Sequence, residues 1–243
     1  RDSYDASMRG SKGSEYDGGH RVPFFLSWPA GGFQKNVVTE LTGHVDITPT
    51  LLEMCSVENK AGVKFDGVSI KDLLDPKKDV QWPERMLVTD SQRVKDPIKW
   101  RKSAVMSSQY RLINGEQLYD IKADPKQANN IAAQHPEVVK SMRAFYDEWW
   151  ADIEPSFKNP AHIILGNPAE NPSRLTCHDW ITTGSTPWNQ QHVRKGVDRA
   201  DNQGFWYVWV EQAGDYEIEL RRWPKQLDHP ISAGLDPGSQ VPG

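Results

Sequence analysis

The chain has 243 residues, a formal net charge of −4, 37% hydrophobic residues and 26% charged residues. This length is sufficient for a buried core and for more than one structural unit. The mean hydropathy is −0.69 and no apolar run is long enough to cross a bilayer, so we expect no membrane partner. The negative net charge provides no general attraction for nucleic acid, and two cysteines are too few for a disulfide framework.

A glycine-rich loop at residues 10–21 carries the first group of chemically active side chains, which comprises Lys12, two carboxylates and the pair His20-Arg21. Glycine allows positive φ angles or the close approach of a ligand, and a lysine in such a loop can reach an anion as a compact charge. The apolar run that follows predicts a buried strand at residues 23–28. On the residues alone, an ordinary strand-entry loop with surface charges is the favoured interpretation.

A short helix is expected after this strand, with Asp46 as its N-cap and Met54 near its end. From Met86 onward the pattern changes to short apolar runs separated by turns, which predicts strands at 86–89, 103–107, 110–113 and 117–120. The dipeptide Asn114-Gly115 is a strong signal for a two-residue hairpin. We therefore expect an antiparallel sheet in this region.

The clearest helical pattern runs from about Pro136 to Trp150. At helical spacing, one stripe of its surface is apolar and is expected to pack on the sheet, and it consists of Val138, Met142, Phe145 and Trp149. After residue 155 prolines become frequent. Two further strands are expected at 205–210, buried on both faces, and at 216–223, within an extension rich in tryptophan.

Three blocks of sequence, taken in order, carry a resemblance to a known family. They are residues 10–23 followed by Trp28-Pro29, residues 45–52 with 66–69 after them, and residues 117–121 with Asp124-Pro125 after them. Together they span about residues 8 to 150 and resemble the later part of sulfatases, especially the arylsulfatase-like enzymes. One departure is Asp17, where the family usually has Glu.

The resemblance implies an α/β (α+β) fold, namely the C-terminal part of an alkaline-phosphatase-like sulfatase domain. We expect three regions: residues 1–80 from the catalytic domain, residues 81–158 as an antiparallel sheet-plus-helix subdomain, and residues 159–243 as a β-rich, Trp-rich extension that is incomplete. The missing N-terminal half of the same protein would then be a partner of this chain. A periplasmic or secreted location is implied by the family alone.

Sulfatases use Ca²⁺ and a formylglycine made from cysteine, and the resemblance implies both for the full-length parent. Neither Cys55 nor Cys177 is followed by the residues that this modification needs, and the metal-binding residues of the family lie upstream. We therefore expect no metal ligands and no bound cofactor in this chain. By resemblance, Lys12 would contact the sulfate of the substrate and act as the catalytic residue present here.

Other side chains are weaker candidates. His20 could contact substrate, although a packed histidine is the more ordinary role, and Asp17 and Arg21 are expected to pair and hold the loop. Arg101 and Trp100 lie in a basic stretch with Arg93, Lys95, Lys99 and Lys102. This stretch could form the rim of a subsite for a sulfated carbohydrate, with Arg101 matching sulfate oxygens and Trp100 stacking on a sugar. The alternative is a solvated loop.

The function expected for the parent protein is therefore hydrolysis of sulfate esters, with this chain inactive alone. Two alternatives stay open. One is a phosphoester or phosphonate hydrolase of the same fold, and the other is a non-catalytic carbohydrate-binding module, which the tryptophan-rich final third suggests.

Overall fold

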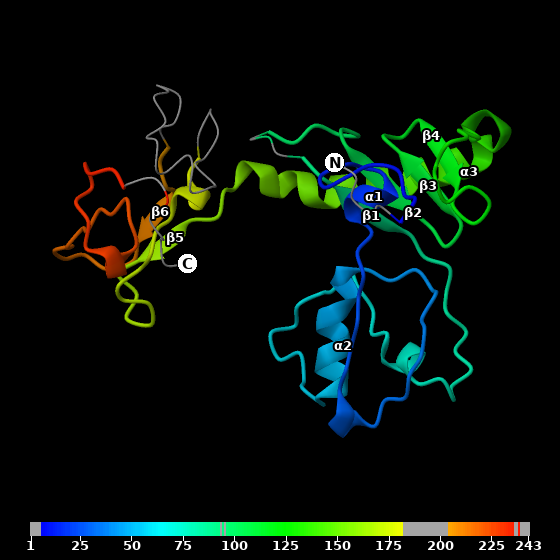
Figure 1. The fold of residues 1–243 in the computed structure, drawn as a ribbon, viewed down its shortest axis with the longest axis horizontal. Coiled ribbons are helices and arrows are strands. Elements are labelled where there is room, and N and C mark those ends of the chain that lie inside the picture. Colours follow the sequence, from blue (N-terminus) through cyan, green and yellow to red (C-terminus); the bar gives the residue numbers. More distant parts are fainter. Residues whose placement is uncertain (1–5, 93, 95, 182–203, 236–237, 239–243) are drawn as a thin grey trace. The chain divides into compact units, whose positions relative to one another are not determined.

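The computed structural model describes residues 6–92, 94, 96–181, 204–235 and 238, and the chain separates into two compact units, residues 1–154 and 155–243 (Figure 1). We call them the N-terminal and the C-terminal unit. The further division of the first unit near residue 80 stays a prediction. In the part of the chain that the structure describes, no helix is long and apolar enough to cross a membrane.

A four-stranded antiparallel sheet forms the centre of the N-terminal unit. Its strands follow one another in space as they do in sequence, and they are β1 (Leu87–Asp90), β2 (Ser103–Met106), β3 (Tyr110–Ile113) and β4 (Gln117–Asp120). Asn114 and Gly115 both have positive φ angles, 50° and 73°, as a tight two-residue hairpin requires. The predicted strands and the predicted hairpin are thus confirmed.

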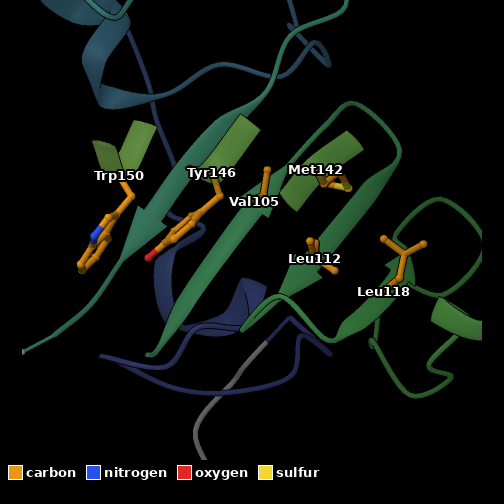
Figure 2. Packing of buried hydrophobic residues seen from close by; sticks show 6 residues of the cluster. All are labelled: Val105, Leu112, Leu118, Met142, Tyr146 and Trp150. Carbon is orange, nitrogen blue, oxygen red and sulfur yellow. The ribbon is translucent and has the colours of Figure 1, made fainter. Parts of the chain in front are cut away.

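Helix α3 (Pro136–Ile153) packs on one face of this sheet and encloses the main core (Figure 2). Val105, Leu112 and Leu118 from the sheet meet Met142, Tyr146 and Trp150 from the helix. The helix is confirmed, and all four residues of the predicted apolar stripe pack on this core. The centre of the contact is the buried row Met142, Tyr146 and Trp150, whose members are four residues apart.

The glycine-rich loop covers the opposite face of the sheet. Ala104, Ile113 and Tyr119 point to this face, and Tyr16 packs against them. The loop contains the four-residue helix α1 (Asp17–His20). The sheet therefore lies between α3 and the loop that carries Lys12.

The predicted strand at residues 23–28 is wrong. These residues form no strand, and the chain enters a 3₁₀-helix at Pro29–Gly31. Phe25 is 89% exposed and Phe24 is 55% exposed. An apolar run becomes a buried strand only when a neighbouring strand accepts its hydrogen bonds, and no described residue of this chain does so here.

Helix α2 (Ile47–Met54) is preceded by a 3₁₀-helix at His44–Asp46. Asp46 stands at the N-cap position, but its side chain does not cap the helix. Instead, the buried carboxylate accepts hydrogen bonds from the backbone N–H groups of Gly43 and Val68 and from Arg85, at 2.8–3.0 Å. Asp46 therefore fastens three chain segments together. The remaining 3₁₀-helices of this unit are Lys71–Leu74 and Ala132–Gln134, and a further one, Glu154–Lys158, begins at the unit boundary.

In the C-terminal unit, β5 (Ile163–Leu165) and β6 (Val208–Val210) pair in parallel. The burial predicted for residues 205–210 is wrong, because Trp209 is 61% exposed and its neighbours in β6 are also exposed. Residues 216–223 form no strand, contrary to the prediction. Short 3₁₀-helices lie at Cys177–Asp179 and Lys225–Leu227.

Candidate anion-binding site

Lys12 lies at the tip of a tight turn. The backbone N–H of Ser14 donates to the carbonyl of Ser11 at 2.8 Å, which leaves Lys12 and Gly13 as the two central residues. Gly13 has φ +85°, a conformation that favours glycine at this position of a turn. The Lys12 side chain is exposed and therefore free to reach a ligand.

The loop then folds back tightly on itself. A Cβ atom at Gly19 would lie 2.1 Å from the carbonyl oxygen of Ser14, so only glycine fits there. The N–H of Gly18 donates to the carbonyl of Arg9 at 2.8 Å, which closes the loop at its base. These contacts give Lys12 a fixed backbone.

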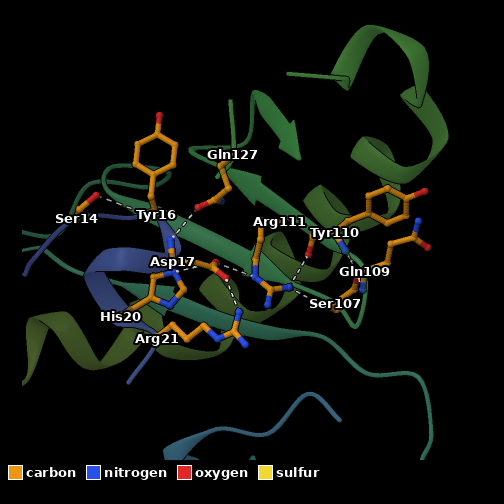
Figure 3. Close-up of polar contacts among 10 residues, drawn as sticks. All are labelled: Ser14, Tyr16, Asp17, His20, Arg21, Ser107, Gln109, Tyr110, Arg111 and Gln127. Carbon is orange, nitrogen blue, oxygen red and sulfur yellow. Dashed lines mark hydrogen bonds and ion pairs between the residues drawn. The ribbon is translucent and has the colours of Figure 1, made fainter. Parts of the chain in front are cut away.

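Asp17 anchors the loop to the sheet (Figure 3). Its carboxylate is buried and accepts a hydrogen bond from Nε of Arg111 on β3, at 3.0 Å. Arg21 lies 3.9 Å away with a side chain that is 61% exposed, so the predicted Asp17–Arg21 pair is present but is the weaker contact. The N–H of Asp17 also donates to Oε1 of Gln127 at 2.9 Å.

Arg9 makes a second connection between the loop and the sheet. Its guanidinium donates to the Tyr119 hydroxyl at 3.1 Å and to the Gln127 carbonyl at 2.8 Å, and it lies 3.9 Å from the centre of the Tyr16 ring. Sequence reasoning missed Arg9, Arg111 and Gln127 as partners of the loop. The only available signal was that Arg111 breaks the apolar pattern of a buried strand.

His20 lies beside Asp17 and away from the tip of the turn. Its Nε2 is 3.9 Å from the Asp17 carboxylate, and the imidazole is largely buried. Burial lowers the pKa of His20 below its ordinary value; the negative charge of Asp17 opposes this shift and the positive charge of Arg111 adds to it. These surroundings support a packing role for His20, and a contact with substrate stays a prediction.

A small hollow of about 150 Å³ brings the lysine turn together with the segment between β1 and β2. We call this segment, residues 91–102, the basic loop. The hollow is lined by Lys12, Gly13, Ser91, Arg101 and Lys102. Two of the sequence candidates, Lys12 and Arg101, thus meet at one place, and no carboxylate is among the lining residues.

Arg101 lines this hollow, and one donor of its guanidinium is unused. Its Nη1 atom is buried and has no hydrogen-bond acceptor among the described residues. A buried guanidinium N–H without an acceptor is energetically unfavourable. The hollow itself is lined by three cationic side chains, those of Lys12, Arg101 and Lys102, which favour the binding of an anion there.

Trp100 occupies a different environment. Its ring stacks on Tyr146 with 3.7 Å between the ring centroids, and the guanidinium of Arg143 lies 5.4 Å from the indole. The structure therefore supports a packing role for Trp100, and stacking on a sugar stays a prediction. Lys99 pairs with Asp147 at 2.8 Å, whereas Arg93 and Lys95 lie outside the described residues.

No metal site is visible in the part of the chain that the structure describes, since no three His, Cys, Asp or Glu side chains come together there. Cys55 is exposed and Cys177 is half-buried, and neither forms a disulfide. The side chains described here thus supply charge and hydrogen-bond donors for an anion, and no set of metal ligands.

Comparison with known proteins identifies the family. Residues 11–150, more than half of the chain, match the model described as "N-sulphoglucosamine sulphohydrolase, C-terminal". The chain belongs to the sulfatase family. The matched region contains the lysine turn, the basic loop, the sheet and most of α3.

Individual sulfatases are similar to the same region. An N-acetylgalactosamine-6-O-sulfatase of Bacteroides thetaiotaomicron is 29% identical over 146 residues, covering 55% of this chain and 28% of that protein. An arylsulfatase of Clostridium perfringens is 30% identical over 170 residues, covering 65% of this chain and 33% of that protein. This chain therefore spans about a third of the length of these relatives.

A solved structure from work on glycosaminoglycan metabolism by Bacteroides thetaiotaomicron aligns with a TM-score of 0.49 and 25% identity, covering 59% of this chain and 32% of that one. The mixed α/β composition predicted for this sulfatase chain, with an antiparallel sheet and a packed helix, is confirmed by its own elements.

Proposed function

We propose that the protein to which this chain belongs hydrolyses sulfate esters, and that the hollow at Lys12 holds the sulfate group of the substrate. The observation that carries this proposal is the meeting of Lys12, Arg101 and Lys102 around a hollow that no carboxylate lines. A hydrogen bond to a charged group of this kind contributes about 1.5–3 kcal/mol. Family membership supports the same reaction.

The substrate class that we propose is a sulfated carbohydrate. One relative is named as an N-acetylgalactosamine-6-O-sulfatase, which supports a sulfated amino sugar. The lining of the hollow is polar and cationic, which suits the sulfate end of such a molecule rather than an apolar group. Nucleic acid and membrane partners remain unexpected.

Hydrolysis also needs a nucleophile and a proton donor for the leaving alcohol. We propose that polypeptide outside residues 1–243 supplies the formylglycine nucleophile and the Ca²⁺ site, because this chain spans about a third of its relatives. In this proposal Lys12 and Arg101 hold and orient the sulfate, and the chain alone releases no sulfate. A periplasmic or secreted location belongs to the same proposal.

The test uses the complete protein, produced together with a formylglycine-generating enzyme. Sulfate release from N-acetylgalactosamine 6-sulfate is followed with and without Ca²⁺. We expect Lys12→Ala to lower kcat/KM by about 10²-fold, the size typical for one lost donor to a developing charge. Lys64→Ala, which removes another exposed lysine, is the matched control and should leave turnover unchanged.

The alternatives give different outcomes in the same assay. Turnover of phosphate esters without turnover of any sulfate ester would favour a phosphohydrolase, because phosphate fits the same cationic hollow. Saturable sugar binding by the complete protein without hydrolysis would favour a carbohydrate-binding module.

A further inference from the structure

Two sets of hydrogen bonds hold the described residues of the basic loop in place. The backbone N–H of Ser91 donates to the carbonyl of Lys102 at 3.1 Å, which closes the loop where β1 ends and β2 begins. The side chain of Gln92 clasps Ile98, because its amide nitrogen donates to the Ile98 carbonyl at 2.8 Å and its oxygen accepts from the Ile98 N–H at 2.7 Å.

Two residues of the loop adopt a backbone conformation that is unusual for their type. Trp100 has φ +65° and Lys102 has φ +51°, and they flank Arg101 directly. Residues with a Cβ rarely occupy this left-handed region. Such conformations persist only where the surrounding structure imposes them. Contacts of Trp100 with the core are therefore needed to keep Arg101 in place.

Tyr146 provides these contacts. The N–H of Trp100 donates to the Tyr146 hydroxyl oxygen at 3.1 Å, and that hydroxyl donates in turn to Oδ2 of Asp90 at 3.0 Å. The rings of Tyr146 and Trp100 stack with an interplanar angle of 23°. Tyr146 is completely buried in the core, on α3 (Figure 2). One hydroxyl thus joins the end of β1 to the residue that precedes Arg101.

The Asp90 carboxylate accepts hydrogen bonds from two side chains. Its Oδ2 also accepts from the Gln92 side chain at 3.2 Å, so the clasp on Ile98 and the Tyr146 hydroxyl converge on one carboxylate. Partial burial raises the pKa of Asp90, while the hydrogen bonds from Gln92 and Tyr146 and the positive charge of Arg101 oppose that shift.

We propose that Tyr146 is a positioning residue of the anion site. Its hydroxyl holds Trp100 in the left-handed conformation and thereby keeps Arg101 on the wall of the hollow beside Lys12. Tyr146 touches no ligand itself and acts through Arg101. This inference rests on the proposed function, because it requires that the hollow bind the sulfate group.

The experiment measures binding of N-acetylgalactosamine 6-sulfate to the complete protein, produced without the formylglycine-generating enzyme so that no turnover occurs, by NMR titration with unsulfated N-acetylgalactosamine as the reference. Tyr146→Phe keeps the ring and removes the hydroxyl, and we expect affinity to fall about fivefold, the size of one lost hydrogen bond. Arg101→Met should lower the affinity about tenfold. The double variant should bind no more weakly than Arg101→Met alone, because both changes act through the same side chain.

Two further variants complete the test. Tyr110 is the first residue of β3, and its backbone N–H donates to the Ser107 hydroxyl at 2.9 Å, at the end of the sheet away from the basic loop. Tyr110→Phe removes a hydroxyl from the same sheet and should leave affinity unchanged. Gln92→Ala removes the hydrogen bonds to Ile98 and Asp90 and leaves the core intact. We expect it to lower the affinity for the sulfated sugar as well. This variant tests whether the loop conformation matters for binding if Tyr146→Phe does not fold. Unchanged affinity in Tyr146→Phe, or losses that add fully with Arg101→Met, would overturn the positioning role. If the complete wild-type protein does not discriminate the sulfated sugar, the proposed function itself fails at this hollow.

Discussion

Asp17 and Arg111, separated by 94 positions in the sequence, form a buried ion pair in which Arg111 Nε donates to Asp17 Oδ1 at 3.0 Å. The pair joins the loop that carries Lys12 to the middle of the sheet. Both side chains are almost completely shielded from water, so each charge depends on the other for compensation. The position of the Lys12 loop therefore depends on the Asp17–Arg111 ion pair, which lies outside the hollow.

The first prediction concerns this pair. Asp17→Ala leaves the Arg111 guanidinium buried without its carboxylate, and we expect the free energy of unfolding to fall by about 3–5 kcal/mol. Arg21→Ala is the control, since its exposed ion pair with Asp17 is worth about 0–1 kcal/mol. Urea unfolding of the three proteins measures both values. Equal losses in the two variants would contradict the account.

The ion pair between Asp46 and Arg85 permits a similar comparison in another part of the N-terminal unit. Arg85→Ala removes the only side-chain donor to the Asp46 carboxylate among the described residues, and we expect a loss of about 3 kcal/mol. Lys71→Ala breaks an exposed pair with Glu53 and should cost about 0–1 kcal/mol. Thermal unfolding of both variants provides the measurement, and a larger effect of Lys71→Ala would be inconsistent with the structure.

The third prediction is a dependence of stability on pH through His20. Burial lowers the pKa of His20 in the folded chain, so the unfolded chain takes up its proton near pH 6.5 while the folded chain remains neutral. Stability from this group is therefore present above pH 6.5 and lost as the pH falls below it. We expect His20→Gln to lose less stability than the wild type between about pH 7.5 and about pH 5.5.

The control for this measurement is His178→Gln, which replaces an exposed histidine. Its stability should follow the pH in the same way as the wild type. If His20→Gln shows the wild-type pH dependence, burial of a neutral imidazole at this position is refuted.

The fourth prediction follows from the exposed apolar segment at residues 22–28. Val22, Phe24, Phe25 and Trp28 are all exposed within seven residues, which forms an apolar patch suited to association. We expect the chain to self-associate with increasing concentration in sedimentation velocity, and Phe25→Ser to reduce this. Ile231→Ser, an exposed apolar residue of the other unit, should have no such effect. A monomer at all concentrations would disprove the prediction.

The sheet and α3 could be predicted because their signals are local. Each signal involves residues only a few positions apart: the alternation of apolar residues along the strands, the Asn114-Gly115 turn and the helical spacing of apolar residues. The position of Lys12 and Arg101 at one hollow was not predicted, although both were candidates. Residues that are distant in sequence come together through the sheet, which no local pattern encodes.

The errors have the same origin. The run at 23–28 has the composition of a buried strand, yet burial depends on a partner that the composition does not specify. Asp46 has the residue type of an N-cap, but Arg85 and two backbone N–H groups compete for its carboxylate and take it away from the helix. The packing of Trp100 on Tyr146, 46 positions away, was likewise not visible in the sequence, while its stacking on a sugar stays a prediction.

The most direct test of the central claim is to observe Arg101 and Lys12 while a sulfated sugar binds. In the complete protein without formylglycine, we expect N-acetylgalactosamine 6-sulfate to shift the NMR signals of the Arg101 guanidinium and of the Lys12 ammonium, and unsulfated N-acetylgalactosamine to leave them unchanged. The Lys12→Ala variant should bind the sulfated sugar about tenfold more weakly. Saturable binding of the sulfated sugar with no change at Arg101, or with full affinity in Lys12→Ala, would contradict the assignment of the sulfate to this hollow.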